Sequence, residues 1–294
     1  MVYICYDCFE KGGREMTKSR FGMMLLAVFA MLTSLMAADA RAQTAAAEAI
    51  PRHPALTDRF TLELGAFYSR STTEASLGPS GGGSGVTVNF EDTLGLEDRN
   101  WVGIGGFLWR ISERWRLEVD YFKLGRDATR TLAADVTWGD QTFAKGSTVS
   151  SSYDFTDMRV AGGYSFFKRP DKELGVGFGL HVAKIEASLQ STAGKAEASD
   201  VTAPLPVLNL YGLFALTNEW AVRFRMDWLS LNYDIYSGDI RSTAIDVLYR
   251  PFRNVGFGLG VRNLALNVEI DDPKWRGKAR TAFNGPVLFM SVGF

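Results

Sequence analysis

The side chains that could do chemistry in this sequence are charged residues and one histidine, placed at every second position of segments whose other residues are apolar. Brought together in an enclosed space, carboxylates and guanidinium groups pair, because an unpaired buried charge is too unfavourable to persist. A histidine among them could add acid–base chemistry. The set consists of Glu63, Arg116, Glu118, Asp120, Asp157, Arg159, His181, Arg223, Arg225, Asp227, Asp246, Arg250 and Arg262.

His181 is the residue on which an enzymatic function would depend. A turn centred near Pro170 predicts that His181 lies opposite Arg159, and a neighbouring guanidinium disfavours a general base. No G-x-S-x-G nucleophile motif occurs. The other histidine, His53, falls in a segment without strand periodicity. We therefore predict no catalytic residue.

Other motifs also point away from metals, cofactors and nucleic acids. Cys5 and Cys8 have C-x-x-C spacing, but a lone pair without further Cys or His partners is weak evidence for a metal or redox site. The glycine-rich run at 81–85 lacks the Lys-Ser/Thr of a phosphate-binding loop. The formal net charge of -1 gives no electrostatic case for binding nucleic acid. We predict no metal and no cofactor.

The N-terminal part has the features of a secretory signal peptide. Lys18 and Arg20 precede an apolar run at 21–36, and small residues at A-x-A spacing follow, ending at Ala40 or Ala42. The run is shorter than the roughly 20 residues of a membrane-spanning helix. We predict a leader and signal peptide over 1–42 with translation starting at Met16, a linker over 43–57, and one β domain over 58–294.

The elements that must position the charged residues are β-strands with one apolar and one ionised face. After Trp115, apolar Leu117 and Val119 alternate with Arg116 and Glu118, and successive side chains of a strand point to opposite faces. This pattern predicts about ten antiparallel strands, with eight or twelve as alternatives. The connections alternate between tight turns and long polar loops, which is typical of transmembrane β-barrels with charges facing the lumen.

Aromatic residues gather near the tight turns, where a membrane interface would hold their amphipathic rings. A second set several residues further along the strands indicates the other interface; it comprises Tyr68, Tyr121, Phe155 and Trp228. The first set, the predicted membrane girdle, comprises Trp109, Trp115, Phe166, Trp220, Tyr249 and Phe294.

An export signal, alternating loops and a last strand ending in Phe294 resemble the bacterial outer-membrane β-barrel proteins, in particular the small OmpA-like and opacity-type barrels. The resemblance implies an all-β fold, location in the outer membrane of a Gram-negative cell, contact with membrane lipid and lipopolysaccharide, and recognition of Phe294 by the barrel-assembly machinery. It brings no catalytic residue with it. We expect a structural or surface-binding protein with a largely charge-filled lumen; a narrow porin-like channel for small solutes and an outer-membrane lipid-modifying enzyme are the alternatives.

Overall fold

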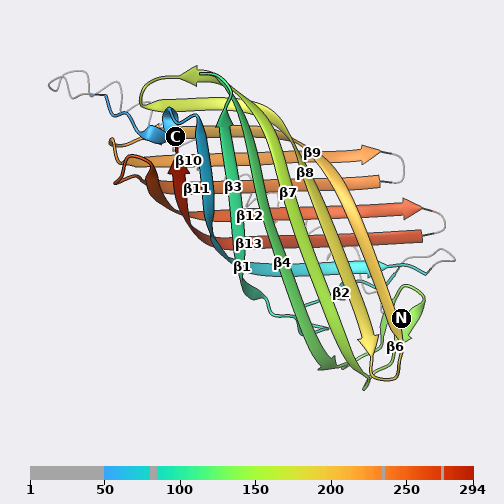
Figure 1. Ribbon diagram of the computed structural model, residues 1–294. Coiled ribbons are helices and arrows are strands. Elements are labelled where there is room, and N and C mark those ends of the chain that lie inside the picture. The colour runs from blue at the N-terminus through green and yellow to red at the C-terminus, as the bar shows by residue number, and fades with distance from the viewer. Residues whose placement is uncertain (1–49, 80–84, 234–235, 273–274) are drawn as a thin grey trace, which may run out of the picture. The chain divides into compact units, whose positions relative to one another are not determined.

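A computed structural model describes residues 50–294 except 80–84, 234–235 and 273–274 (Figure 1). The predicted signal peptide and residues 43–49 of the predicted linker lie outside the described residues. A 3₁₀ helix (Pro54–Leu56) precedes the strands. None of the helical segments described is long and apolar enough to cross a membrane.

The strands form one closed antiparallel barrel, as the sequence predicts. β13 pairs with β1 from Thr61↔Gly293 to Leu77↔Gly277, so the last strand closes on the first. Within the described part of the chain the barrel has ten strands, which confirms the favoured count. They are β1 (Phe60–Leu77), β3 (Arg99–Arg110), β4 (Trp115–Thr131), β7 (Thr148–Lys168), β8 (Lys172–Ser191), β9 (Ala196–Ala215), β10 (Trp220–Tyr233), β11 (Tyr236–Tyr249), β12 (Val255–Asp272) and β13 (Trp275–Gly293).

Three short strands lie in the long connections rather than in the barrel wall. β2 (Val88–Asn89) pairs with β1, and β5 (Val136–Trp138) pairs with β6 (Gln141–Phe143) in a small hairpin. The strand that begins at Trp115 ends at Thr131, before this hairpin. Between β8 and β9 the connection is a tight turn after Ser191.

The outer half of the barrel, at the end with the long connections, separates into two sheets that face each other (Figure 1). The β9–β10 pairing stops at Leu208↔Trp228, and the β3–β4 pairing stops at Ile104↔Phe122. Beyond these points β4, β7, β8 and β9 stay together as sheet I, while β10, β11, β12, β13 and β1 stay together as sheet II. A face-to-face pair of sheets needs an apolar core between them.

The described residues provide that core. Phe155 of sheet I and Phe283 of sheet II have ring centroids 4.6 Å apart, and Phe122 lies 5.6 and 5.9 Å from the same two rings. Phe155 and Phe283 are fully buried. The prediction that Phe155 belongs to the outer aromatic girdle is therefore wrong: it shares the inward face of β7 with Asp157 and Arg159.

The outward face of the barrel carries an exposed apolar band, which a membrane protein presents to lipid. Its members include Leu62, Leu64, Phe178, Leu180, Leu259, Val261 and Leu288. Aromatic pairs border the band: Trp220 stacks on Tyr249 at 4.4 Å at the tight-turn end, and Tyr68 lies 4.9 Å from Trp101 further along. Apolar outward faces and charged inward faces are the arrangement expected of a barrel in a bilayer.

Candidate functional site

The centre of the barrel interior is occupied by Arg159 and the carboxylates around it. Its guanidinium donates to Asp227 at 2.8 and 3.1 Å, to Glu118 at 2.9 Å and to Asp120 at 3.0 Å. Arg225 approaches the same Asp120 at 2.9 Å. Since these residues lie on β4, β7 and β10, the contacts cross the interior rather than run along one sheet. We call this set the central network.

A second group of ion pairs lies beside it on β1, β10 and β11. Arg223 donates to both oxygens of Glu63 at 2.6 and 2.9 Å and lies 2.8 Å from Asp246. Bidentate geometry of this kind is the strong form of an arginine–carboxylate contact. Arg262 is within electrostatic range of Asp246 and Asp120.

A third group lies toward the tight-turn end. Arg116 pairs with Glu118 at 2.6 Å, and its guanidinium lies over the ring of Tyr211 at 3.1 Å from the centroid. Arg110 pairs with the fully buried Glu173 at 2.8 Å. Arg110 and Glu173 are not among the lumen residues predicted from the sequence. The sequence pattern could have identified them, however, because each occupies one of the alternating strand positions whose side chains face inward.

His181 lies opposite Arg159 in the β7–β8 register, as the position of the turn predicts. Its Nδ1 is 3.0 Å from Asp157, and its Nε2 is 3.7 Å from Asp227. Two carboxylates therefore hold the ring, in addition to the Arg159 that the turn predicts opposite it. The imidazole is 1% exposed. A carboxylate-oriented imidazole can act as a base, but here it is enclosed by the ion pairs. The described residues contain no cluster suited to a metal ion.

Glycines that face inward would widen a channel only if nothing filled the space they leave. A Cβ at Gly175 would lie 2.1 Å from the ring of Tyr211, and a Cβ at Gly258 would lie 2.1 Å from the ring of Phe289. At Gly260 it would lie 2.2 Å from Asp246. Aromatic and charged side chains from other strands therefore occupy the room that these glycines make.

The segment before β1 covers the tight-turn end of the interior; we call residues 50–58 the periplasmic lid. Arg110 donates to the carbonyl of Ala55 at 2.9 Å, and Arg250 pairs with Asp58 at 2.8 Å. His53 and Leu56 are each 1% exposed. Burial, followed by the charge of Arg250, lowers the pKa of His53 to about 4. Residues 50–57 of the predicted linker therefore lie against the barrel.

The space left between the lid and the central network is small. It is a cavity of about 50 Å³ bordered by His53, Glu63, Arg116, Arg223 and Arg250. Since one water needs about 10–15 Å³ measured this way, the cavity holds only a few waters. The predicted lumen residues are thus distributed over the central network, the His181–Asp157 pair, the two groups beside the network and the lid contacts.

The predicted girdle residues lie at or near the tight-turn ends of the strands. Trp115, Phe166, Trp220 and Phe294 are exposed, and Trp109 and Tyr249 are partly buried by neighbouring rings. The backbone of Phe294 also closes the barrel, since its N–H donates to Phe60 and its carbonyl accepts from Arg59.

Comparison with known proteins supports the fold rather than a particular activity. No family model and no curated protein sequence matches the chain. Among solved structures, the outer membrane protease OmpT from Escherichia coli has 8% sequence identity and a TM-score of 0.52, with 80% of this chain and 96% of that chain covered. The Pseudomonas putida toluene transporter TodX has 10% identity, a TM-score of 0.35 and coverages of 81% and 90%. Ail, the attachment invasion locus protein of Yersinia pestis, has 8% identity and a TM-score of 0.34, with 79% of this chain and 97% of that chain covered.

The chain is therefore a closed β-barrel of the bacterial outer-membrane type. The fold, the exposed apolar band and the charged interior together place it in the outer membrane. At these identities the likeness to solved structures concerns the fold alone.

Proposed function

We propose that the protein is a non-conducting outer-membrane barrel with a structural or surface-binding role, in which the lumen is closed and the outer half presents the contact surface. The observation that carries the proposal is the central network, where Arg159 spans the interior between Glu118 on one side and Asp227 on the other. Paired charges of this kind are rigid and well satisfied.

Closure at two further levels supports the proposal. The periplasmic lid buries His53 and Leu56 below the network, and the core between sheets I and II, with Phe122, Phe155 and Phe283, fills the interior above it. A solute would have to displace an apolar core, an ion-pair network and a lid in turn.

Conductance in planar lipid bilayers tests the closed lumen. We expect no steady single-channel steps from the wild-type protein, at protein densities where an established porin conducts in the same membrane. Vesicle swelling with a small sugar, after counting inserted barrels per vesicle, gives an independent measurement. Steady unitary steps or rapid swelling would overturn the closed lumen and favour a narrow channel.

The alternative of a lipid-modifying enzyme is tested through His181. We propose that expression leaves lipid A and phospholipids unchanged, because the imidazole is enclosed between Asp157 and Asp227. Mass spectrometry of membrane lipids from cells with wild-type protein, the His181→Ala variant or no protein measures this. A modification that appears with the wild type and disappears with His181→Ala would establish an enzyme instead.

The outer membrane also implies partners. We propose that the exposed apolar band contacts membrane lipid and lipopolysaccharide, and that the barrel-assembly machinery recognises Phe294, whose ring is 68% exposed.

A further inference from the structure

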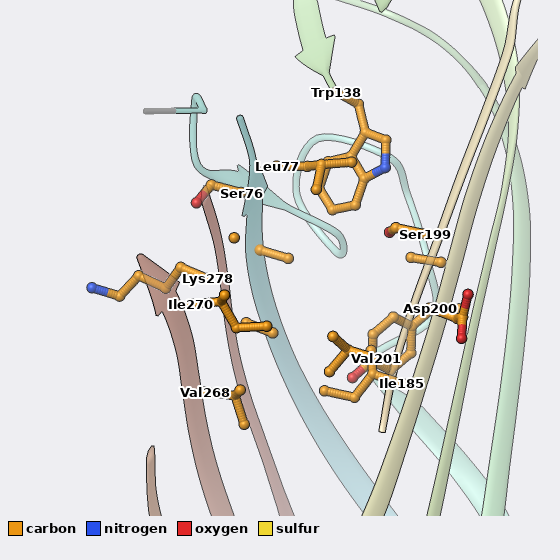
Figure 2. A pocket seen from close by; sticks show the side chains of 15 residues that line it. Ser76, Leu77, Trp138, Ile185, Ser199, Asp200, Val201, Val268, Ile270 and Lys278 are labelled. Carbon is orange, nitrogen blue, oxygen red and sulfur yellow. The ribbon is translucent and has the colours of Figure 1, made fainter. Parts of the chain in front are cut away.

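A pocket lies at the outer end of the interior, where sheets I and II diverge. Figure 2 shows side chains from both sheets pointing into the space between them, with Ile185 and Val201 on one side and Val268 and Ile270 on the other. Trp138 of the β5–β6 hairpin reaches into the same space. The pocket is separate from the charged interior, since the ring of Phe155 and its neighbours fill the space between the sheets deeper in the barrel.

The surface of this pocket is almost entirely apolar. Leu77, Ile185, Ala187 and Val268 form much of it, and each is a buried residue of the apolar core. The enclosed part measures about 50 Å³, room for three or four water-sized groups. Because a buried water needs two to four polar partners, such a surface holds water poorly. A short apolar group suits the enclosed part better.

One buried polar group in the pocket has no partner. Trp138 is 2% exposed, packs edge-on against Phe90, and its indole N–H has no hydrogen-bond acceptor among the described residues. Leaving a buried donor unpaired is unfavourable, so such a group calls for an explanation. In Figure 2 the indole nitrogen lies on the side of the ring nearest Ser199 of β9.

Charged residues lie at the border of the pocket. Lys278 and Asp200 lie at its border, and Lys278 pairs with Glu269 at 3.3 Å. The remainder of a bound molecule would therefore meet a polar, water-accessible rim. Small-molecule sites commonly combine an apolar lining with a few placed polar groups.

We propose that this pocket binds a small molecule with a short unbranched alkyl end and one hydrogen-bond acceptor, such as a ketone or ester carbonyl, which receives the Trp138 N–H. The alkyl end occupies the enclosed apolar part, and the acceptor satisfies the indole. The proposal deepens the surface-binding role and rests on it.

Site-specific photolabelling tests the proposal without interference from dissolved probe in the membrane. The protein in lipid nanodiscs is irradiated with an alkyl diazirine that carries a methyl ketone, or with the same alkyl diazirine without the ketone, and the labelled peptides are mapped by mass spectrometry. We expect the ketone probe to label peptides that contain Ile185 and Ala187 or Val268 and Ile270, saturably and in preference to the hydrocarbon probe.

Two matched pairs of variants separate the pocket from the rest of the surface. Trp138→Phe removes the donor together with part of the ring, so its effect is measured against the hydrocarbon probe, which responds to the change of shape alone. Labelling by the ketone probe is expected to fall roughly three- to tenfold relative to the hydrocarbon probe, as for one lost hydrogen bond; Trp101→Phe removes an exposed indole, 71% accessible, and is expected to change nothing. Ser199→Phe, at the half-buried border, blocks the pocket, whereas Thr202→Phe faces outward on the same strand and does not.

The outcomes are distinct. Labelling confined to the lipid-facing residues, or unaffected by Ser199→Phe in a variant with normal heat-modifiable gel mobility, would overturn the pocket assignment. If both probes label the pocket equally and Trp138→Phe leaves that labelling unchanged, the proposed hydrogen bond from Trp138 to the acceptor is overturned. If the pocket is not labelled and planar bilayers show no conductance, the pocket assignment fails and the closed barrel stands. If the bilayers conduct and the pocket is labelled specifically, the closed barrel is refuted and the pocket assignment stands.

Discussion

Arg159 of β7 and Asp227 of β10 are joined across the barrel interior by two parallel hydrogen bonds, Nε to Oδ2 at 2.8 Å and Nη2 to Oδ1 at 3.1 Å. Two strands, β8 and β9, separate them in the wall. The pair therefore ties together segments that no backbone ladder connects directly. It is fully buried, with 1% and 0% of the two side chains exposed.

Breaking this pair on one side is expected to be more damaging than removing it altogether. Asp227→Leu leaves the Arg159 charge less compensated and should lower the free energy of unfolding by about 3–5 kcal/mol, whereas Arg159→Met with Asp227→Leu should recover much of that loss. Urea unfolding in lipid vesicles, followed by tryptophan fluorescence, measures the free energy of unfolding of the wild type and of each variant. Lys184 and Glu186, an exposed pair at 2.9 Å, serve as the control and should contribute far less, because water screens an exposed ion pair. Equal effects for the two pairs would refute the central network as a structural element.

Gly175 is expected to resist even the smallest side chain. Gly175→Ala would drive a Cβ into the ring of Tyr211, 2.1 Å away, and should destabilise the barrel by about 1–3 kcal/mol. Gly162→Ala is the matched control, because its Cβ meets nothing within 4 Å. Tyr211→Leu combined with Gly175→Ala should restore part of the stability. If Gly175→Ala alone unfolds at the wild-type urea concentration, Tyr211 does not fill the lumen as described.

The periplasmic lid is expected to loosen in acid. A released His53 takes up a proton near pH 6.5, whereas the docked residue does so only at about pH 4, so docking weakens as the pH falls through this window. Asp58 works in the opposite direction, because burial raises its pKa above the usual value despite the nearby Arg250 charge. Fluorescence anisotropy of a dye on Ile50→Cys should therefore fall between about pH 6.5 and 4.

The variant His53→Phe provides the control for the lid. It keeps a buried ring and removes the titrating group, so the fall in anisotropy should be absent or reversed by the remaining Asp58 contribution. An acid-induced fall that is identical in His53→Phe would show that another group controls the lid.

The lipid-facing band is expected to reject charge. Leu64 lies outward on β1, 55% exposed, midway between the rings of Phe60 and Tyr68. An arginine near the bilayer midplane costs about 2–4 kcal/mol, so Leu64→Arg should lower stability by that amount and reduce the heat-modifiable folded form on gels. Val86→Arg, at an exposed loop position outside the strands, should behave as wild type. Unchanged folding of Leu64→Arg would contradict the assigned face.

The sequence predicted the strand number, the alternation of tight and long connections and the antiparallel barrel because each depends on local patterns. The two-residue period fixes which side chains share a face, and Arg159 and His181 fell opposite each other because a short turn sets the register of its hairpin. The same parity argument, applied to every strand, would have found Arg110 and Glu173, and would have placed Phe155 inside.

Parity says only that a side chain faces the interior; it does not say what meets it there. By itself, the sequence determined an outer-membrane barrel with charged residues inside the membrane-spanning part. Only the tertiary structure decided that Arg159 reaches Asp227, that Tyr211 fills the space at Gly175, that the lid buries His53, and that the outer half closes into two sheets around Phe155 and Phe283. Those contacts join strands and loops far apart in the chain, and their geometry depends on barrel closure and on where the pairing of β9 with β10 stops.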